Sequence, residues 1–579
     1  MPNMIQNAKD SISQILNAAY QKAAEKGELP AGAALSGTVE IPKDSANGDF
    51  AANHAMAGAK ALHMAPRKIA ETLIANADLA DTWFASVEVA GPGFINFRLA
   101  DRWYADVLNA VTREGADYGR SDIGHGQKVM VEFVSANPTG PMHMGNARGG
   151  VLGDALASVL DRAGYQVWRE FYVNDAGNQI EKFANSIDAR YQQLLLGEEQ
   201  VAFPEDGYHG DDIKDLAKLF YEANGDKYLT VPVAERHQAM AEFGLQRNIP
   251  KMQEDLRRYG IEYDQWFFES ELHESGYVAE SVQKLTDRGY TYEKDGALWL
   301  KTSQILAEQL LKAGKKQEEI DKLELKDDVL RRANGFYTYF AADIAYHRNK
   351  LEKRGFDKAI NVWGADHHGH VARLKGAMDA LGLDGEHRLD IVLMQLVKLT
   401  RNGEVVRMSK RTGKAISLTD LLDEIPVDAA RYFFNSRPES PVEFDLELAI
   451  RQDSENPVYY VQYAHARICT LLSALAAEGH SVPASADAAL LSTPEEKELI
   501  KQLAALPEEI RLAARDYDPS RINRYVTEMA ARFQRFYTVC RIKCAESDVQ
   551  ASRLLLADCV RRVIAVSLGI IGVTAPEKM

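Results

Sequence analysis

Cysteine is scarce in this chain: only four of the 579 residues are cysteines, and none stands in a Cys-x-x-Cys pair. The sequence therefore predicts neither a disulfide framework nor a cysteine-built zinc ribbon, and it fits a reducing compartment, the cytoplasm. Cys540 and Cys544 are four residues apart on an expected helix, but no histidine lies near them. We interpret them as small core residues rather than metal ligands, and we expect no protein-bound structural metal.

Long apolar runs are also missing. The longest, residues 563–573, is too short to cross a bilayer. The first 20 residues are amphipathic and do not resemble the apolar core of a signal peptide. We therefore expect no membrane partner.

The chain lacks a positive net charge: its formal charge is -16. This argues against a protein that coats nucleic acid through its overall field. One local stretch, residues 531–562, nevertheless carries seven Lys and Arg against three Asp and Glu. Such a stripe is usually only a solvated helix face. Here aromatic residues interleave with the cations, which favours a local RNA-binding surface.

The chain is too long for one hydrophobic core, which stops growing at about 250–300 residues. The patterns predict three domains. Residues 1–122 form a small α+β domain, in which a Gly-Pro-Gly turn precedes the alternating strand 94–99. Residues 123–455 form an α/β domain. Residues 456–579 read as helices only, and Pro483 and Pro507 are expected to separate them.

The middle domain has the pattern of a Rossmann-like parallel sheet. Residues 128–134 read as a buried strand, 149–163 as a helix and 167–173 as the next strand, which together make a βαβ unit. A second unit follows, with strand 359–363, helix 371–381 and strand 391–399. The polar, acidic stretch at about 185–268 is expected to be part of a helical insertion between the two halves.

The loop at residues 135–150 joins the first strand to the first helix and carries His143 and Gly145. Free N–H groups and a positive dipole make such a helix N-terminus an anion site. Gly145 would let a nucleotide approach the backbone, and His143 could donate a hydrogen bond to a phosphate. Taken alone, the loop also fits a histidine that merely caps its neighbour.

A second segment, residues 407–413, reads Arg-Met-Ser-Lys-Arg-Thr-Gly. With Lys414 it holds four cations on a glycine-containing loop, which suits a triphosphate whose charge grows in a transition state. Standing alone, it would be better explained as a solvated basic loop.

The two segments together are far more specific. His143-Met144-Gly145-Asn146 and residues 407–411 resemble the paired signatures of class I aminoacyl-tRNA synthetases. The wider sequence resembles bacterial arginyl-tRNA synthetases over essentially its whole length, at residues 93–97, 131–150, 173–179, 456–467 and 568–579. The resemblance implies an enzyme that activates L-arginine with ATP and Mg²⁺ and transfers it to the 3′ end of tRNA(Arg). It further implies a monomer that needs bound tRNA before it activates arginine.

The resemblance also assigns the residues around ATP. It implies a catalytic role for His143, Asn146 and Lys410, and ATP binding by Gly145, Met408 and Ser409. His367 and His370 are assigned to the ATP or arginine pocket by their position, after a strand end in the second half of the sheet and at a helix start. The sequence departs from the family at Asn146, where a second signature histidine is usual; asparagine cannot be cationic but can donate through its amide. Some relatives replace the lysine of the second signature by one placed three residues before the first signature histidine. This chain has Gly140 there and keeps Lys410.

For the amino acid, the resemblance points to Glu132, Ser135 and Asn137 after the first strand, with Tyr339 and Asp343 on one helix face. A guanidinium requires carboxylates in fork geometry. An unpaired carboxylate on a buried strand is costly, which favours binding by Glu132 over a purely structural role. Two alternatives remain: Tyr339 stands in an aromatic run and could be a core residue, and a helical aspartate such as Asp343 is usually solvated.

For tRNA, the resemblance implies that the first domain touches the D-loop, with Asn96 and Phe97 in contact. It implies that the last domain reads the anticodon through Tyr460, Tyr463, Arg467 and Met579. The first three are spaced by three and four residues and so share a helix face. The alternative is that both tyrosines belong to the core.

Several alternative functions fit parts of the sequence. The run at residues 366–370, Asp-His-His-Gly-His, allows a metal site or a phosphoesterase, but the further aspartate clusters of such enzymes are missing. A class I synthetase for another amino acid, such as cysteine, should carry a cysteine-rich zinc site. A non-catalytic tRNA-binding paralogue should have lost His143 or Lys410. A small-molecule nucleotidyltransferase would have no use for the helical last domain.

Overall fold

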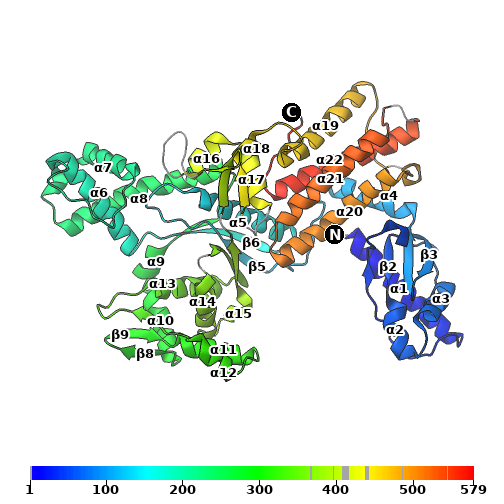
Figure 1. Ribbon diagram of the computed structural model, residues 1–579, viewed down its shortest axis with the longest axis horizontal. Helices are drawn as coiled ribbons and strands as arrows, with labels where there is room; N and C mark the ends of the chain where they lie inside the picture. The colour runs from blue at the N-terminus through cyan, green and yellow to red at the C-terminus, as the bar shows by residue number, and fades with distance from the viewer. Residues whose placement is uncertain are drawn as a thin grey trace.

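The computed structural model describes residues 3–365, 368–395, 397–406, 416–436, 442–485, 487–543 and 546–579. Figure 1 shows a central sheet with helical lobes on either side, and the N-terminal domain at one end, next to the C-terminal helices. Within the described ranges, no helix is both long and apolar enough to cross a membrane.

The N-terminal domain is a four-stranded antiparallel sheet with helices packed against it. The strand order is β1-β2-β4-β3, and the expected strand 94–99 is β4. The strands are β1 Val39–Glu40, β2 Phe50–Ala52, β3 Phe84–Ala90 and β4 Phe94–Leu99; the helices are α1 Met4–Glu25, α2 His54–Leu62 and α3 Pro66–Asn76. A further helix, α4 Asp101–Glu114, leaves this sheet and packs against the C-terminal helices.

The central sheet is parallel throughout, in the order β12-β11-β5-β6-β7. Its strands are β5 Lys128–Glu132, β6 Gln166–Val173, β7 Gln265–Phe268, β11 Lys358–Gly364 and β12 Leu389–Met394. The chain runs outward from β5 to β6 and β7, and then returns to the other side of β5 for β11 and β12. Ligands bind at such a switch point, beyond the carboxyl ends of the strands. The expected site residues after the first strand lie there.

Helix α5, Met144–Arg162, connects β5 to β6 and starts five residues before the expected helix 149–163. The start is earlier because His143 caps it. The insertion follows as α6 Asn178–Leu196, α7 Asp211–Asn224 and α8 Val233–Arg258, with a core of its own. The last residues of the expected insertion, 265–268, differ: they are strand β7, paired in parallel with β6 at the sheet edge.

The chain between β7 and β11 forms a second lobe, which was not predicted from the sequence. In Figure 1 this lobe lies below the central sheet. It contains a small antiparallel sheet in the order β10-β9-β8. Its elements are α9 Glu269–Glu274, α10 Tyr277–Asp287, β8 Thr291–Lys294, β9 Ala297–Leu300, α11 Thr302–Lys312, α12 Gln317–Ile320, β10 Asp328–Arg331 and α13 Tyr339–Arg348. A π-helical turn, η5 Asn349–Lys353, continues α13.

The expected strand 391–399 is two strands. Its first part is β12 in the central sheet, and its second part belongs to β13, which pairs with β14 and β15 in a separate sheet. The elements of this part are α14 His368–Ala380, α15 Gly385–Arg388, β13 Val397–Arg401, β14 Glu404–Val405, α16 Leu418–Glu424, α17 Val427–Asn435, β15 Val442–Asp445 and α18 Leu446–Ile450.

The C-terminal domain is helical, as predicted. It consists of α19 Pro457–Ala477, α20 Pro494–Asp516, α21 Ser520–Val539 and α22 Ser547–Ile570. Pro483 lies between α19 and α20, as expected. The break expected at Pro507 was wrong: this proline lies inside α20. It cannot donate to the carbonyl of Leu503, and the hydroxyl of Tyr118 donates to that carbonyl instead, at 2.9 Å.

Candidate active site

A strained turn ends strand β5 and begins the site. The N–H of Ser135 donates to the carbonyl of Phe133 at 3.0 Å, and φ is 69° at Val134 and 43° at Ser135. A β-branched valine rarely adopts this left-handed region, and such strain is typical of ligand sites. The turn brings the Ser135 hydroxyl back to Glu132, to which it donates at 2.9 Å, while it accepts from the N–H of Tyr172 at 3.1 Å.

His143 is the N-cap of helix α5. Its Nδ1 accepts from the N–H of Gly145 at 3.0 Å, and its own N–H donates to Oδ1 of Asn146 at 3.0 Å. Desolvation lowers the pKa of His143, so the ring is neutral near pH 7. Because Nδ1 accepts, the ring proton is on Nε2. The histidine can therefore cap the helix and also donate to a phosphate.

Asn146 completes this capping box through its oxygen. The capping bond leaves the two amide hydrogens of Asn146 available as donors. His143 and Asn146 can therefore each take part in the helix cap and still donate a hydrogen bond to a ligand.

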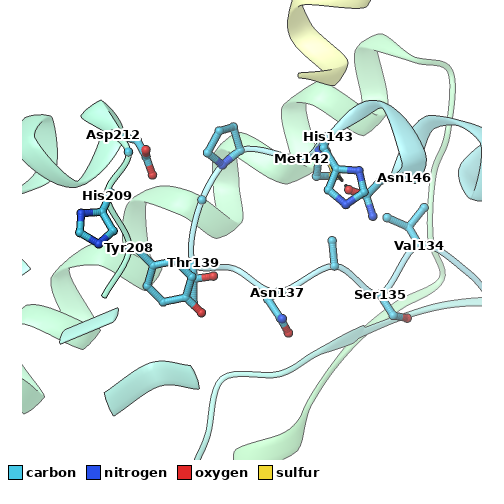
Figure 2. Close-up of a pocket in the computed structure, with 14 residues that line it drawn as sticks. Val134, Ser135, Asn137, Thr139, Met142, His143, Asn146, Tyr208, His209 and Asp212 are labelled. Carbon is cyan, nitrogen blue, oxygen red and sulfur yellow. Dashed lines mark hydrogen bonds between the residues drawn. The ribbon is translucent and has the colours of Figure 1, made fainter. Parts of the chain in front are cut away.

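The loop after the turn lines a cavity of about 490 Å³. Figure 2 shows Ser135, Asn137, Thr139 and His143 along the first signature loop, and Tyr208, His209 and Asp212 of the insertion on a separate segment that also lines the cavity. Gly140 is part of this lining, and a Cβ placed there would stand 3.3 Å from the carboxylate of Asp212. The insertion therefore contributes part of the cavity wall beside the first signature loop. This contact could not be predicted from the sequence, because residues 208–212 match no motif.

Glu132 is not the unpaired carboxylate that its strand position suggested. Its Oε2 lies 2.5 Å from Nζ of Lys350, whose side chain is 0% exposed. Lys350 also donates to Oδ1 of Asn361 at 3.0 Å. The neighbouring strand repeats the arrangement: Glu170, which stands opposite Glu132 in the sheet, pairs with Arg354 at 2.5 Å. The desolvation argument for Glu132 is corrected accordingly, since Lys350 supplies its counter-charge.

Tyr339 and Asp343 begin helix α13, whose N-cap is Thr338. The Tyr339 side chain is 42% exposed, so the core alternative for it does not hold; Phe340 is the buried member of that aromatic run. Tyr339 borders a second cavity of about 560 Å³, beside Gly177.

His370 contacts the proposed arginine site rather than standing apart from it. Arg373 donates to its Nδ1 at 3.1 Å, so its Nε2 donates to the carboxylate of Asp343, also at 3.1 Å. A further ring contact places Trp363, at the end of β11, 5.8 Å from the His370 ring. His370 thereby fixes one of the two carboxylates assigned to the guanidinium.

Four predicted ATP-site residues, His367, Met408, Ser409 and Lys410, lie outside the described residues. The chain that follows the second signature is nevertheless tied to the first. Ile416 accepts from the N–H of Met144 at 3.2 Å, and the N–H of Leu418 donates to the carbonyl of Met142 at 2.8 Å. The chain from residue 416 onward therefore lies directly beside the first signature loop.

Comparisons with known proteins match this organisation along the chain. The chain matches the arginyl tRNA synthetase N terminal domain at residues 6–99, the class I (R) tRNA synthetase catalytic domain at 107–442 and the DALR anticodon binding domain at 461–579. The chain belongs to the arginyl-tRNA synthetase family. It is 52% identical to the arginine–tRNA ligase of Acetivibrio thermocellus and 54% identical to that of Caldanaerobacter subterraneus subsp. tengcongensis, in each case over 100% of both chains.

The solved structure of Thermus thermophilus arginyl-tRNA synthetase has the same fold, with a TM-score of 0.73 over 99% of this chain and 100% of that chain at 21% identity. The predicted arginyl-tRNA synthetase family, the three-part fold class and the arginine–tRNA ligase activity are thus confirmed.

The N-terminal residues expected to touch tRNA are corrected by the structure. Phe97 is 0% exposed, and its ring meets that of Phe84 edge-on at 5.1 Å in the domain core. Asn96, which precedes Phe97 in strand β4, is 3% exposed and therefore also buried. Both residues are thus buried, and neither is exposed for contact with RNA in this structure. The exposed aromatic residue of this strand is Phe94.

The residues expected to bind the anticodon differ in how exposed they are to solvent. Tyr463 is 45% exposed and stacks on Tyr459, with ring centroids 6.1 Å apart. Tyr460 is half-buried and packs against the core. Arg467 lies 4.2 Å from the ring centroid of Tyr537 on α21.

Met579 is 53% exposed. The tail that leads to it is fastened to α19, because Gln462 donates to the carbonyl of Thr574 at 3.0 Å and His465 to that of Pro576 at 2.9 Å. The chain end is therefore brought toward the helix that carries the tyrosines.

Proposed function

We propose that the chain ligates L-arginine to tRNA(Arg) in two steps at the switch point of the central sheet. The observation that carries this assignment of the site is the neutral, helix-capping His143 beside the turn that holds Glu132 and Ser135. An anion-binding helix N-terminus and a carboxylate site for a guanidinium thereby lie on one loop.

Arginine is proposed to bind through its guanidinium to the carboxylates of Glu132 and Asp343, with Ser135, Asn137 and Tyr339 around it. Ser135 is already bonded to Glu132, and Asn137 lines the cavity next to it. Carboxylates from two different elements provide the planar acceptors that a guanidinium fork requires.

In the first step, a carboxylate oxygen of arginine attacks the α-phosphorus of ATP, and pyrophosphate leaves. No general base is needed, because the attacking carboxylate is ionised; the protein positions the reactants and stabilises charge. Nε2 of His143 donates to a phosphate oxygen, Gly145 and Asn146 border the nucleotide, and Lys410 neutralises the growing charge. Met408, Ser409, His367 and His370 complete the proposed site.

Mg²⁺ is proposed to enter with ATP, bound mainly by phosphate oxygens and water, as is usual for this ion. The described residues fit that mode, since no group of three or more His, Cys, Asp or Glu side chains among them forms a metal site of its own. When bound, the ion supplies charge neutralisation at the phosphates.

In the second step, the terminal ribose hydroxyl of tRNA attacks the carbonyl carbon of the adenylate, and AMP leaves. We propose that the anticodon is bound by Tyr460, Tyr463, Arg467 and Met579 within residues 456–579. Residues 1–122 contact the D-loop, and residues 123–455 carry the chemistry. One chain holds all of these parts, so a cytoplasmic monomer is sufficient.

The direct test is arginine-dependent exchange of pyrophosphate into ATP, with and without tRNA(Arg). We expect exchange with arginine and tRNA together, and none with lysine, because a buried site built for one hydrogen-bonding group rejects analogues by about 10⁴-fold. Exchange supported equally by lysine would contradict the assigned pocket.

A further inference from the structure

Lys350 is a fully buried lysine next to the proposed arginine site. Its side chain is 0% exposed and bonds to Glu132 and Asn361 at 2.5 and 3.0 Å. Its Nζ also lies 4.2 Å from the ring centroid of Tyr346. Lys350 belongs to the π-helical turn η5, and π-helical turns are rare and occur frequently at functional sites.

The hydrogen bonds around Lys350 form one consistently oriented chain. Lys350 donates to Oδ1 of Asn361, and Nδ2 of Asn361 donates to Nε2 of His347 at 2.7 Å. The pKa of His347 is lowered well below its ordinary value, chiefly by burial and further by the ammonium of Lys350, so the ring is neutral. Its Nδ1 therefore donates to the carbonyl of Asp343 at 2.7 Å.

This chain runs from the carboxylate of Glu132 to the backbone of Asp343, the residue that carries the second carboxylate assigned to the guanidinium. At one end Lys350 holds Oε2 of Glu132, while Ser135 holds Oε1. At the other end the backbone of Asp343 is fixed on α13. The charges also match: Glu132 and Lys350 neutralise each other, so Asp343 supplies the single negative charge that one guanidinium balances.

We propose that Lys350 is a positioning residue for arginine recognition, which orients Glu132 and keeps it ionised. The proposal rests on the proposed role of Glu132 in binding arginine. Lys350 does not touch the substrate itself. Its removal should weaken arginine binding without affecting ATP.

The physical argument is the cost of a lone buried charge. Without the ammonium, an ionised Glu132 would be a carboxylate in an enclosed site with only Ser135 as a donor, and such a carboxylate takes up a proton. A protonated carboxyl no longer offers two anionic oxygens to the guanidinium. Arginine binding in the variant should then recover as the pH rises.

Other groups that face Glu132 do not titrate in the range to be tested. Tyr172, Tyr263 and Tyr346 have pKa values raised well above the ordinary tyrosine value, mainly by burial, and His347 stays neutral. Asp343 and His370 face the same pocket from α13 and α14, and any effect of theirs appears equally in the unaltered enzyme. A pH dependence present only in the variant therefore reports on Glu132.

The experiment measures the KM for arginine and for ATP in full-length enzyme with tRNA, between pH 6 and 8.5. For Lys350→Met we expect the arginine KM to rise roughly 10- to 100-fold near pH 7, the loss of one hydrogen bond to a charged group, and to fall again toward pH 8.5. The ATP KM should stay within about 2-fold, since no ATP contact is removed. Lys350→Arg, which keeps the charge, should recover most of the loss.

The control is Lys358→Met. Lys358 pairs with Asp390 at 2.6 Å at the opposite end of β11, so its loss should leave the arginine KM unchanged. If Lys350→Met does not fold, Lys350→Gln keeps a polar amide donor but not the charge, and it should show the same pH-dependent rise.

Failure of this inference is distinct from failure of the proposed function. Glu132→Gln should raise the arginine KM at every pH; if it does not, Glu132 does not bind arginine and the proposed pocket is wrong. If Glu132→Gln raises the arginine KM while the neutral variants of Lys350 leave it unchanged across the pH range, Lys350 is only a structural partner and the inference is overturned.

Discussion

The hydroxyl of Tyr118 donates a hydrogen bond of 2.9 Å to the backbone carbonyl of Leu503. Leu503 stands four residues before Pro507, and a proline has no N–H to offer that carbonyl. Tyr118 is fully buried at the end of the N-terminal part of the chain. A residue from a distant segment thus replaces the missing helical bond and joins α20 to the start of the catalytic domain.

Tyr118→Phe should therefore destabilise the enzyme by about 1–3 kcal/mol, because it leaves a buried carbonyl without a donor. In a Pro507→Ala background, residue 507 regains its N–H and can donate to the Leu503 carbonyl. The destabilisation caused by Tyr118→Phe should then be much smaller than in the unaltered background. Urea unfolding of the four chains of this double-mutant cycle measures the coupling. Equal costs of Tyr118→Phe in both backgrounds would show that the two residues act independently.

The cap and the phosphate donor at His143 can be separated by substitution. Asn is a good N-cap but does not extend to the position of Nε2. His143→Asn should keep the thermal stability and lower the kcat of arginine activation by roughly 10²–10³-fold, the scale of one charge-stabilising donor. His143→Ala should lose activity and also about 0.5–2 kcal/mol of stability. Normal activity of His143→Asn would mean that the residue is only a cap.

Acid should destabilise the enzyme through His347. Burial lowers its pKa well below the ordinary value, so the unfolded chain binds the proton more readily than the folded one. The stabilisation is complete above about pH 6.5 and is lost as the pH falls below it, at about 1.4 kcal/mol per pH unit. His347→Gln should reduce that slope, as measured by urea unfolding between pH 7 and 5.

The matched control for the acid effect is His387. Its ring is exposed, and its pKa is raised, chiefly by the hydrogen bond to Asp384 and further by the charge of that carboxylate. Any stability it adds is present at low pH and lost as the pH rises, so His387→Asn should not reduce the acid loss. If both variants flatten the profile alike, the effect does not arise from burial of His347.

The two tyrosines of α19 should respond differently to alanine. Tyr463 is exposed and stacked on Tyr459, so Tyr463→Ala should weaken tRNA binding by about 1–3 kcal/mol, the value of one stacked base, with little change in Tm. Half-buried Tyr460 should also lose stability when truncated. Binding of tRNA(Arg) measured by filter retention, beside thermal melting, separates the two effects; a large drop in Tm for Tyr463→Ala would assign it to packing.

Removal of Met579 alone should weaken aminoacylation and leave Tm nearly unchanged. The anchors of the tail, Gln462 and His465, bond to residues 574 and 576 and remain in place. Aminoacylation kinetics with saturating arginine and ATP provide the measurement. Unaltered kinetics would show that the exposed terminal side chain has no part in recognition.

Periodicity and signature residues predicted the parallel sheet, the helical last domain and the loop of His143, because these depend on local pattern. They did not predict the second lobe, whose short strands β8 to β10 pair only with one another. They also placed Phe97 at the surface, although its ring completes the domain core. Burial by residues distant in sequence cannot be read from a short segment.

The same limit applies within the site. Glu132 was expected to be costly when buried, which was right in principle, but its partner is 218 residues further along the chain. Nothing in the sequence around Lys350 distinguishes it from a surface lysine, because residues 347–354 are polar or charged except for Leu351. The signatures predicted where the chemistry takes place, whereas only the tertiary fold shows which side chain pairs with Glu132.

Glu132 and Glu170 have a consequence for synthesis of the chain on the ribosome. Their partners Lys350 and Arg354 both come from one short segment, 218 and 184 residues downstream. Until that segment emerges, β5 and β6 cannot bury these two carboxylates as a pair of strands without an uncompensated charge. The first half of the catalytic domain should therefore remain open during translation, and its sheet should close only after the π-helical turn has been made.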